Sequence, residues 1–280
     1  MRVLITGASG MLGTDLVRKL AGSHEIIPLS SKEMDVTREE ETRRVIREAA
    51  PQAIVHAAAF TRVDDCEKER DKAFRINGDG TRYVALGARD TGARLLTIST
   101  DYVFDGKKEG GYREEDPTAP LGVYGQSKLA GEQAVREILE DYLILRTSWL
   151  FGRNGPNFVR TILRIAREQP VLRVVHDQRG SPTYTPDLAD GIARLIETPA
   201  RGIVHLSNSG TCTWWEYAVE ILRLTGVEGV TVLPITTAES GRPAPRPANS
   251  ILDNNRYETF TGHRLRHWKE ALKDYLRENP

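Results

Sequence analysis

The stretch "TGASGMLG", residues 6–13, decides the fold of this chain. It places Gly7, Gly10 and Gly13 directly after the apolar run "RVLI" and at the start of Met11–Ala21, whose apolar residues recur at helical spacing. A strand, a glycine turn and a helix N-terminus in this order are typical of dinucleotide-binding folds, because glycine lets backbone amides approach a pyrophosphate. The spacing is G-x-x-G-x-x-G, so an ordinary glycine-rich turn is the alternative interpretation.

The segments that follow repeat the alternation of this first unit. The runs "HEIIPLS", "QAIVHAAA", "RLLTIST" and "YLILRTS" predict strands, and the segments between them have helical patterns. Such strands pair in parallel, so we expect an α/β fold with a doubly wound, Rossmann-type sheet. The rhythm loosens in the second half. We therefore expect a dinucleotide-binding domain and a smaller C-terminal substrate-binding lobe: residues 1–150 rejoined by 185–208, and residues 151–280, mainly 151–184 and 209–280.

Composition and charge exclude several classes of protein. Among the 280 residues, 39 Lys and Arg balance 39 Asp and Glu, so nothing favours nucleic acid or a membrane surface as a partner. No apolar run approaches the ~20 residues that cross a bilayer. The opening "MRVLITGASG" has too short an apolar part for a signal peptide. Cys66 and Cys212, the only cysteines, fit a reducing compartment and exclude a cysteine-built zinc site. We expect a cytoplasmic protein.

The end of the second predicted strand bears on the choice of cofactor. An acid at this position would hold ribose hydroxyls and favour NAD, but the strand ends "PLSSK" without one. Lys32 could meet a 2′-phosphate instead, or could be an ordinary solvated lysine. Downstream, Asp35 is a possible acceptor for the adenine amino group.

The stretch "YGQSK" places Tyr124 and Lys128 four residues apart on a predicted helix, so both face one space. A phenol titrates near ~10, and a neighbouring ammonium stabilises the phenolate and lowers that pKa. Thr100 closes a strand at the carboxyl edge of the sheet, where ligands bind, and could orient a carbonyl oxygen. A chance Tyr and Lys on a solvated helix face is the alternative, which the combination with the glycine turn makes less attractive.

This combination resembles the extended branch of the short-chain dehydrogenase/reductase superfamily. Six further motifs span nearly the whole chain and resemble the dTDP-4-dehydrorhamnose reductase family: "HAAAFTRVDDCE", "STDYVFDG", "YGQSKLAGE", "LRTSWLFG", "DQRGSPT" and "RPANSILDN". The resemblance implies an oxidoreductase that reduces the 4-keto group of dTDP-4-dehydro-6-deoxy-L-mannose to dTDP-L-rhamnose, with NADPH or NADH supplying hydride. This reaction is the last step of dTDP-rhamnose synthesis.

The resemblance also implies a role for each matching residue. Tyr124 would donate the proton, Lys128 would assist it and hold the nicotinamide ribose, and Thr100 would bond the substrate C4 oxygen. Asp101 would lie beside the sugar, and Trp149 would pack on the sugar or its phosphate. The pyrophosphate would meet Gly10, Met11 and Leu12, the adenine would meet Asp35 and Val36, and the cofactor would also be lined by Ala59, Phe60 and Thr61. From the residue patterns themselves we add Gly7, Gly13, Lys32 and Ala58 to the expected cofactor site.

Other functions stay open at this point. A nucleotide-sugar epimerase or dehydratase uses the same scaffold, although it usually has the acid that "PLSSK" lacks, and a dehydratase needs more acid–base groups than "STDYVF" offers. A non-catalytic NADP-binding subunit, resembling the regulatory subunit of methionine adenosyltransferase, is the third possibility. The intact Thr100, Tyr124 and Lys128 argue against it.

Two features of the second half concern ligands. The loop-like segments "DQRGSPT" and "GRPAPRPANSILDN" contain Arg179, Arg242 and Arg246, whose guanidinium groups suit a diphosphate, although most loop arginines are merely solvated. Some members of the family form a homodimer around a magnesium ion held by glutamates. This chain has Asp15 in the early position, so we predict no metal and leave a homodimer open.

Overall fold

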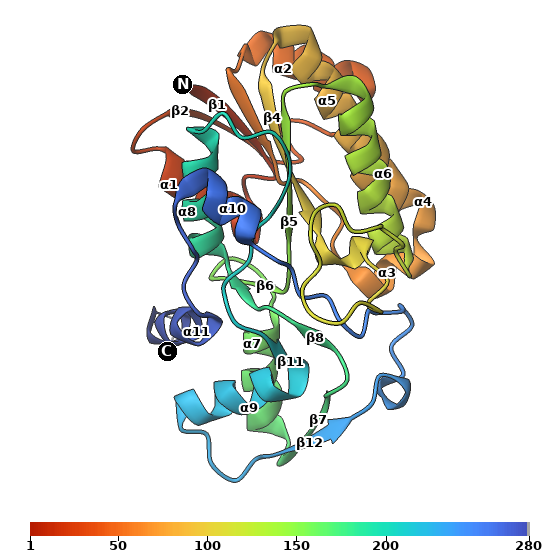
Figure 1. Ribbon diagram of the computed structural model, residues 1–280, viewed down its shortest axis with the longest axis vertical. Coiled ribbons are helices and arrows are strands. Elements are labelled where there is room, and N and C mark those ends of the chain that lie inside the picture. Colours follow the sequence, from red (N-terminus) through yellow and green to blue (C-terminus); the bar gives the residue numbers. More distant parts are fainter. Residues whose placement is uncertain (279–280) are drawn as a thin grey trace.

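The computed structural model describes residues 1–278, and within them a six-stranded parallel sheet forms the centre of the first half (Figure 1). The strand order is β10-β5-β4-β3-β1-β2. The strands, in chain order, are β1 (Arg2–Thr6), β2 (Glu25–Leu29), β3 (Ala53–His56), β4 (Arg94–Thr100), β5 (Tyr142–Thr147) and β10 (Gly202–His205). The expectation of a doubly wound α/β fold is confirmed.

Helices cover both faces of this sheet. On one face α1 (Met11–Leu20) packs against α8 (Thr185–Ile196), and on the other α5 (Gly80–Thr91) packs between α2 (Glu39–Ala49) and α6 (Val123–Ile138) (Figure 1). Each face has its own apolar core, because strands covered on both faces are buried along their whole length.

The connection from β3 to α5 is less regular than the sequence predicts. Short helices α3 (Val63–Lys68) and α4 (Arg70–Ala73) lead into a π-helical turn, η1 (Phe74–Asp79), which continues into α5. A wider turn of this kind often marks a functional position, because it re-aims side chains. Here it points the buried Asn77 at the loop after β3.

The second half is built around aromatic side chains. Helices α7 (Phe158–Glu168), α9 (Trp214–Thr225) and α11 (Trp268–Glu278) surround a core that contains Phe151, Tyr184, Tyr217 and Trp268. Three two-stranded sheets complete this part: β6 (Leu150–Phe151) with β9 (Thr183–Tyr184), β7 (Val171–Val175) with β12 (Thr231–Ile235), and β8 (Arg179–Gly180) with β11 (Cys212–Thr213).

Two segments depart from the sequence-based interpretation in detail. The stretch 177–186, expected to be a loop, contains β8 and β9. Helix α10 (Asn255–Thr261), which follows the second expected loop, contacts β10 and α8 and so packs on the sheet half. The division into two parts with the bounds given above stays a prediction.

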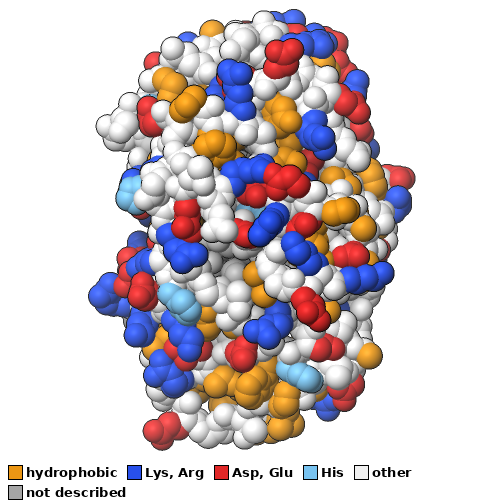
Figure 2. Space-filling model, in the orientation of Figure 1, with side chains coloured by type: hydrophobic (Ala, Val, Ile, Leu, Met, Phe, Trp, Pro, Cys, Tyr) orange, Lys and Arg blue, Asp and Glu red, His pale blue; other side chains and the backbone are white. Residues whose placement is uncertain are grey.

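The surface and the helices add little to the functional classes already considered. Acidic and basic side chains are interspersed on the face shown in Figure 2, in keeping with the zero net charge. Within residues 1–278, no helix has the length and apolar composition needed to span a bilayer.

Candidate active site

A cavity of about 490 Å³ lies at the carboxyl ends of the strands. Its wall includes the glycine turn, the end of β4, the first turns of α6 and the chain that follows β5. Trp214 and Arg246 reach the same cavity from the second half. Residues from both halves therefore meet where an open α/β sheet is expected to bind its ligand.

The glycine turn is shaped by close backbone contacts. Gly7 has a φ of +66°, and a Cβ there would lie 2.7 Å from the amide nitrogen of Ala58. A Cβ on Gly13 would lie 2.1 Å from the carbonyl oxygen of Gly7, so no larger residue fits. Gly10 precedes α1 without a side-chain cap, and the first turn contains no acid. The helix N-terminus therefore keeps its positive potential for an anion, which fits the pyrophosphate of a dinucleotide.

Thr100, Tyr124 and Lys128 all line this cavity, as the sequence motifs predict. Thr100 is the last residue of β4, and its Oγ1 accepts a hydrogen bond from the Tyr102 amide (3.2 Å). Tyr124 lies in the first turn of α6, with its ring edge-on to Tyr102 at 5.8 Å between centroids. Lys128 lies one turn further and is buried.

The electrostatics of this corner differ from the sequence-based expectation. Burial raises the pKa of Tyr124, and the influence of Lys128 that was expected to lower it is not among the principal causes. Burial also lowers the pKa of Lys128 to about 8, because the ammonium loses its hydration. The expectation of a lowered phenol pKa is therefore wrong for this structure. A raised value keeps the phenol protonated at neutral pH, which is the form that a proton donor needs.

A buried ion pair joins β4, β5 and α6, the elements around Thr100, Tyr124 and Lys128. Glu132, one turn beyond Lys128 on α6, accepts two hydrogen bonds from Arg146 of β5, at 2.9 and 2.7 Å. It also accepts one from the Ser99 hydroxyl of β4 (2.5 Å). Ser99 and Arg146 are direct neighbours across the sheet. Since Ser99 precedes Thr100, this carboxylate fixes α6 relative to the strand end.

Asn77 provides a second link between elements of the site. Its side chain accepts from the Phe60 amide (2.8 Å) and donates to the Phe60 carbonyl oxygen (3.0 Å). It also donates to the hydroxyl of Ser127 (3.0 Å), the neighbour of Lys128. The loop after β3 is thereby tied to the helix that presents Lys128.

Trp149 has an unusual backbone for a bulky residue. Its φ is +48°, in the left-handed region, and its indole stacks on that of Trp214 with centroids 3.6 Å apart and planes within 8°. A Cβ on Gly180 would lie 2.5 Å from the indole, so this glycine provides the space that the ring needs. Strain of this kind persists where the surroundings enforce it, commonly at ligand sites.

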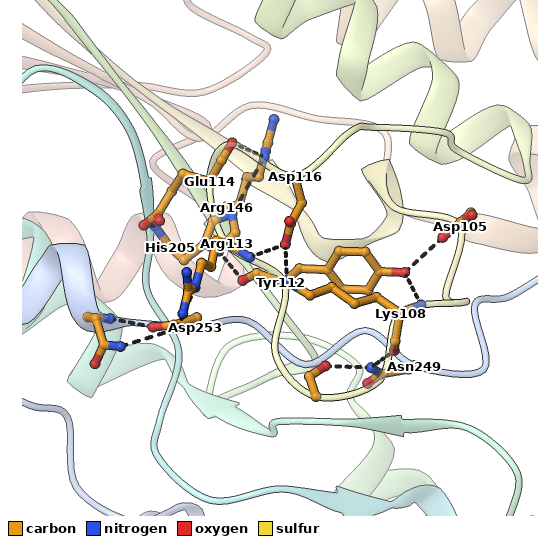
Figure 3. A network of polar contacts seen from close by, with 12 residues as sticks. Asp105, Lys108, Tyr112, Arg113, Glu114, Asp116, Arg146, His205, Asn249 and Asp253 are labelled. Atoms are coloured by element: carbon orange, nitrogen blue, oxygen red, sulfur yellow. Dashed lines mark hydrogen bonds and ion pairs between the residues drawn. The ribbon is translucent and has the colours of Figure 1, made fainter.

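The segment 249–253 is held against the loop 105–116 by a polar network (Figure 3). Tyr112 pairs with the backbone of Ile251 and Asp253, and its hydroxyl donates to Asp105 (2.8 Å). Asn249 donates to the carbonyl oxygens of Lys108 and Gly110 (2.6 Å each). These contacts fix the segment 249–253 against the loop 105–116.

Comparison with known proteins places this chain in a family. The family model described as "RmlD substrate binding domain" matches residues 1–279. The chain belongs to the RmlD family. The resemblance indicated by the motifs is thereby confirmed.

Three relatives match this chain along nearly their whole length. The spore coat polysaccharide biosynthesis protein SpsK of Bacillus subtilis is 47% identical, over 99% of this chain and 97% of the relative. A dTDP-4-dehydrorhamnose reductase of Streptomyces griseus is 43% identical, over 98% and 92%. The crystal structure of dTDP-4-dehydrorhamnose reductase from Bacillus anthracis in complex with NADP matches with a TM-score of 0.95, 44% identity and 99% of each chain.

Most of the residues that the RmlD family resemblance singled out line the cavity. They are Gly7, Gly10, Met11, Leu12, Gly13, Ala59, Thr61, Thr100, Asp101, Tyr124, Lys128 and Trp149. Their individual contacts with ligands stay predictions.

The predicted adenine end of the site lies outside the cavity walls. Lys32 is exposed, Val36 is buried in the core, and neither is a lining residue. Asp35 accepts from the amide (3.0 Å) and hydroxyl (2.8 Å) of Thr37. Ala58 and Phe60 likewise do not line the cavity, and Phe60 is buried under the loop after β3.

Sequence reasoning missed an acid near this end. Glu33 folds back on the end of β2, where its carboxylate accepts from the Ser30 amide (2.8 Å) and from the Ser30 hydroxyl. Those hydrogen bonds lower the pKa of Glu33. The stretch "PLSSK" contains no acid, but it ends at Lys32, and Glu33 is the next residue.

The three candidate arginines differ in whether they reach the cavity wall. Arg246 lines the cavity, and its guanidinium donates to Asp64 of α3 (2.9 Å). Arg242 pairs with the same carboxylate (3.1 Å) but is exposed and does not reach the cavity wall. Arg179 is exposed in β8 and is not a lining residue either.

Ten further lining residues were given no role from the sequence, although seven of them lie within the quoted motifs. They come from strand ends, from the chain after β5 and from the second half, and are Ala57, Val63, Ile98, Ser99, Tyr102, Thr147, Ser148, Leu150, Pro156 and Trp214. Trp214 opens a stretch with an amphipathic helical pattern, which gives no reason to expect a ligand contact.

Asp15, the position of interest for a metal, faces inward. It is buried and accepts a hydrogen bond from the Thr185 hydroxyl (2.7 Å), which links α1 to α8. Within residues 1–278, no group of three or more His, Cys, Asp or Glu side chains is arranged to hold a metal ion.

Proposed function

We propose that this protein reduces the 4-keto group of dTDP-4-dehydro-6-deoxy-L-mannose to dTDP-L-rhamnose. The observation that carries the proposal is the meeting of Thr100, Tyr124 and Lys128 with the glycine turn in one cavity. The names of the RmlD relatives from Streptomyces griseus and Bacillus anthracis support the same reaction and a dTDP-sugar substrate. The NADP bound to the latter supports a nicotinamide dinucleotide as cofactor.

Each residue of the corner has a chemical task in this reduction. When bound, a nicotinamide cofactor would supply hydride to C4 of the sugar. Thr100 donates a hydrogen bond to the C4 oxygen and so holds the carbonyl group in place. Tyr124 gives its proton to that oxygen as negative charge develops on it, a step that is typically worth ~10²–10⁴ in rate. Lys128 donates to the nicotinamide ribose hydroxyls, and its ammonium stabilises the phenolate once it forms.

The remaining lining residues suit the two ends of the ligands. Gly7, Gly10 and Gly13 would hold the cofactor pyrophosphate against the N-terminus of α1. The stacked indoles of Trp149 and Trp214 offer an apolar face for the sugar or the base. On this proposal the sheet half binds the cofactor and the second half binds the sugar nucleotide. The reaction takes place in the cytoplasm.

Turnover of the purified protein tests this function. NADPH oxidation is followed by absorbance at 340 nm with dTDP-4-dehydrorhamnose as substrate, and the product sugar is identified by its NMR spectrum. A reductase yields one dTDP-rhamnose for each NADPH consumed. Binding of NADPH without turnover would instead favour a regulatory subunit. A changed sugar with no net NADPH loss would favour an epimerase or a dehydratase.

A further inference from the structure

Asp101 is a buried acid in the cavity wall, next to the residues that carry out the proposed reduction. It follows Thr100 directly and begins the 3₁₀ turn η2 (Asp101–Val103). The residue is only 2% exposed and lines the cavity. Its Oδ2 is buried and has no hydrogen-bond partner within the described chain, although the Ser250 hydroxyl lies close enough to lower the pKa of the acid.

The hydroxyl of Thr100 connects this acid to the proposed proton donor. The Thr100 hydroxyl donates a hydrogen bond to Asp101 Oδ1 (3.0 Å). The same side chain hydrogen-bonds to Tyr124, which partly offsets the effect of burial on the phenol pKa. A hydroxyl both donates and accepts, and its hydrogen rotates to suit its partners. The Thr100 hydroxyl thus lies between Asp101, to which it is hydrogen-bonded, and Tyr124, with which it shares the cavity wall.

The charged and titratable groups around Asp101 leave it without a cationic partner of its own. Tyr102 lies on the same turn, and Tyr124 and Lys128 face the cavity from α6. Lys128 interacts with Glu132 behind it, and Arg246 is paired with Asp64. Burial is the principal influence and raises the pKa of Asp101 to about 7, so a large fraction of the molecules hold this acid protonated near neutral pH.

We propose that Asp101 returns a proton to Tyr124 through the Thr100 hydroxyl after each reduction, an inference that rests on the proposed function. In the reduction the O–H bond of Tyr124 breaks and an O–H bond forms at C4 of the sugar. Thr100 then passes its proton to the phenolate and receives one from the Asp101 carboxyl. Tyr124 and Thr100 are restored and Asp101 is left as a carboxylate, which takes a proton from solvent when the product leaves.

A comparison of the first turnover with the steady state distinguishes proton return by Asp101 from a purely structural role of this residue. In wild type, the first turnover uses the proton already on Tyr124, whereas every later turnover needs the acid. Asp101→Asn keeps the size of the side chain and removes the transferable proton. We expect the later turnovers of this variant to run at least about tenfold more slowly than its own first turnover. Stopped-flow absorbance at 340 nm measures both phases, with Asp71→Asn on the exposed face of α4 as the matched control.

Three outcomes would overturn the relay. They are a steady state of Asp101→Asn equal to wild type, an equal loss in both phases, and a wild-type steady state that does not decline relative to the first turnover as pH rises above about 7. The last measurement uses only wild type, so the test survives if the variant does not fold. Failure of the proposed function looks different, because wild type itself would then oxidise no NADPH.

Discussion

The expected cofactor and substrate site has two parts that are built in opposite ways. One is the buried corner of Thr100, Asp101, Tyr124 and Lys128, and the other is the end of β2. Thr100, Asp101 and Lys128 are each buried to at least 95%, and the Glu132–Arg146 pair fixes the elements that present them. Lys32 and Glu33 are exposed. The first region is therefore rigidly buried, whereas any electrostatic effect of the exposed side chains after β2 is expected to be small.

The largest effect is expected from Tyr124→Phe, which tests whether the buried corner performs the chemistry. The change deletes one hydroxyl and keeps the ring against Tyr102. Turnover should fall ~10²–10⁴-fold while NADPH binding, measured by fluorescence titration, stays nearly intact. Tyr83→Phe on α5 removes the same atom away from the cavity and serves as control. A Tyr124→Phe rate within threefold of wild type would remove Tyr124 from the role of proton donor.

The second prediction concerns the stability cost of the buried acid. The pKa of Asp101 is about 7 in the fold, against an ordinary value of 3.8. Its contribution to stability is therefore complete below pH 3.8 and is lost as pH rises through about 7, because only the unfolded chain ionises freely. Asp101→Asn lacks this loss. Between pH 5 and pH 8 the variant should gain ~2–3 kcal/mol relative to wild type.

Urea unfolding at the two pH values measures this difference, with Asp71→Asn as a control that should track wild type. If the stability difference between Asp101→Asn and wild type does not change with pH, the acid is not held protonated by the fold. Burial would then have no measurable effect on the protonation of Asp101, and the electrostatic difference from the exposed end of β2 would disappear.

The two regions also differ in how far the sequence could predict them. Gly7, Gly10, Gly13, Tyr124 and Lys128 fall into local patterns whose spacing determines their geometry, and all five line the cavity. Trp214 and Arg246 reach the same cavity from segments far along the chain, so only the folded arrangement brings them there.

Electrostatics were harder still to predict. The spacing of Tyr124 and Lys128 suggested a lowered phenol pKa, but burial dominates and raises it. A sequence pattern does not report how far a particular side chain is removed from water in the folded protein. The positive φ of Trp149 escaped prediction for a similar reason, because it depends on the space left by Gly180 and on the stack with Trp214.

The third prediction tests which arginine of the second half contacts the substrate. Arg246 and Arg242 share the carboxylate of Asp64, but only Arg246 lines the cavity. Arg246→Ala should raise the KM for the dTDP-sugar about tenfold, as expected for one charge-assisted hydrogen bond to a phosphate, and leave the KM for NADPH unchanged. Arg242→Ala is the matched control and should change neither constant by more than about twofold. Equal effects of the two variants would mean that the Asp64 pair, and not a ligand contact, is what matters.

The smallest effect is expected at the exposed end of β2, where two opposite charges stand side by side. Lys32 is free to approach a 2′-phosphate, whereas the Glu33 carboxylate, held on Ser30, would repel it. Lys32→Ala should raise the KM for NADPH about two- to fivefold and leave that for NADH alone, since an exposed charge contributes little. Glu33→Gln should lower the KM for NADPH by a similar factor. Because both effects are electrostatic, they should shrink when the salt concentration is raised from 0.05 to 0.5 M. If Lys32→Ala moves both constants together, or Glu33→Gln favours neither cofactor, then this end of β2 does not read the 2′-phosphate and the preference must be set within the cavity.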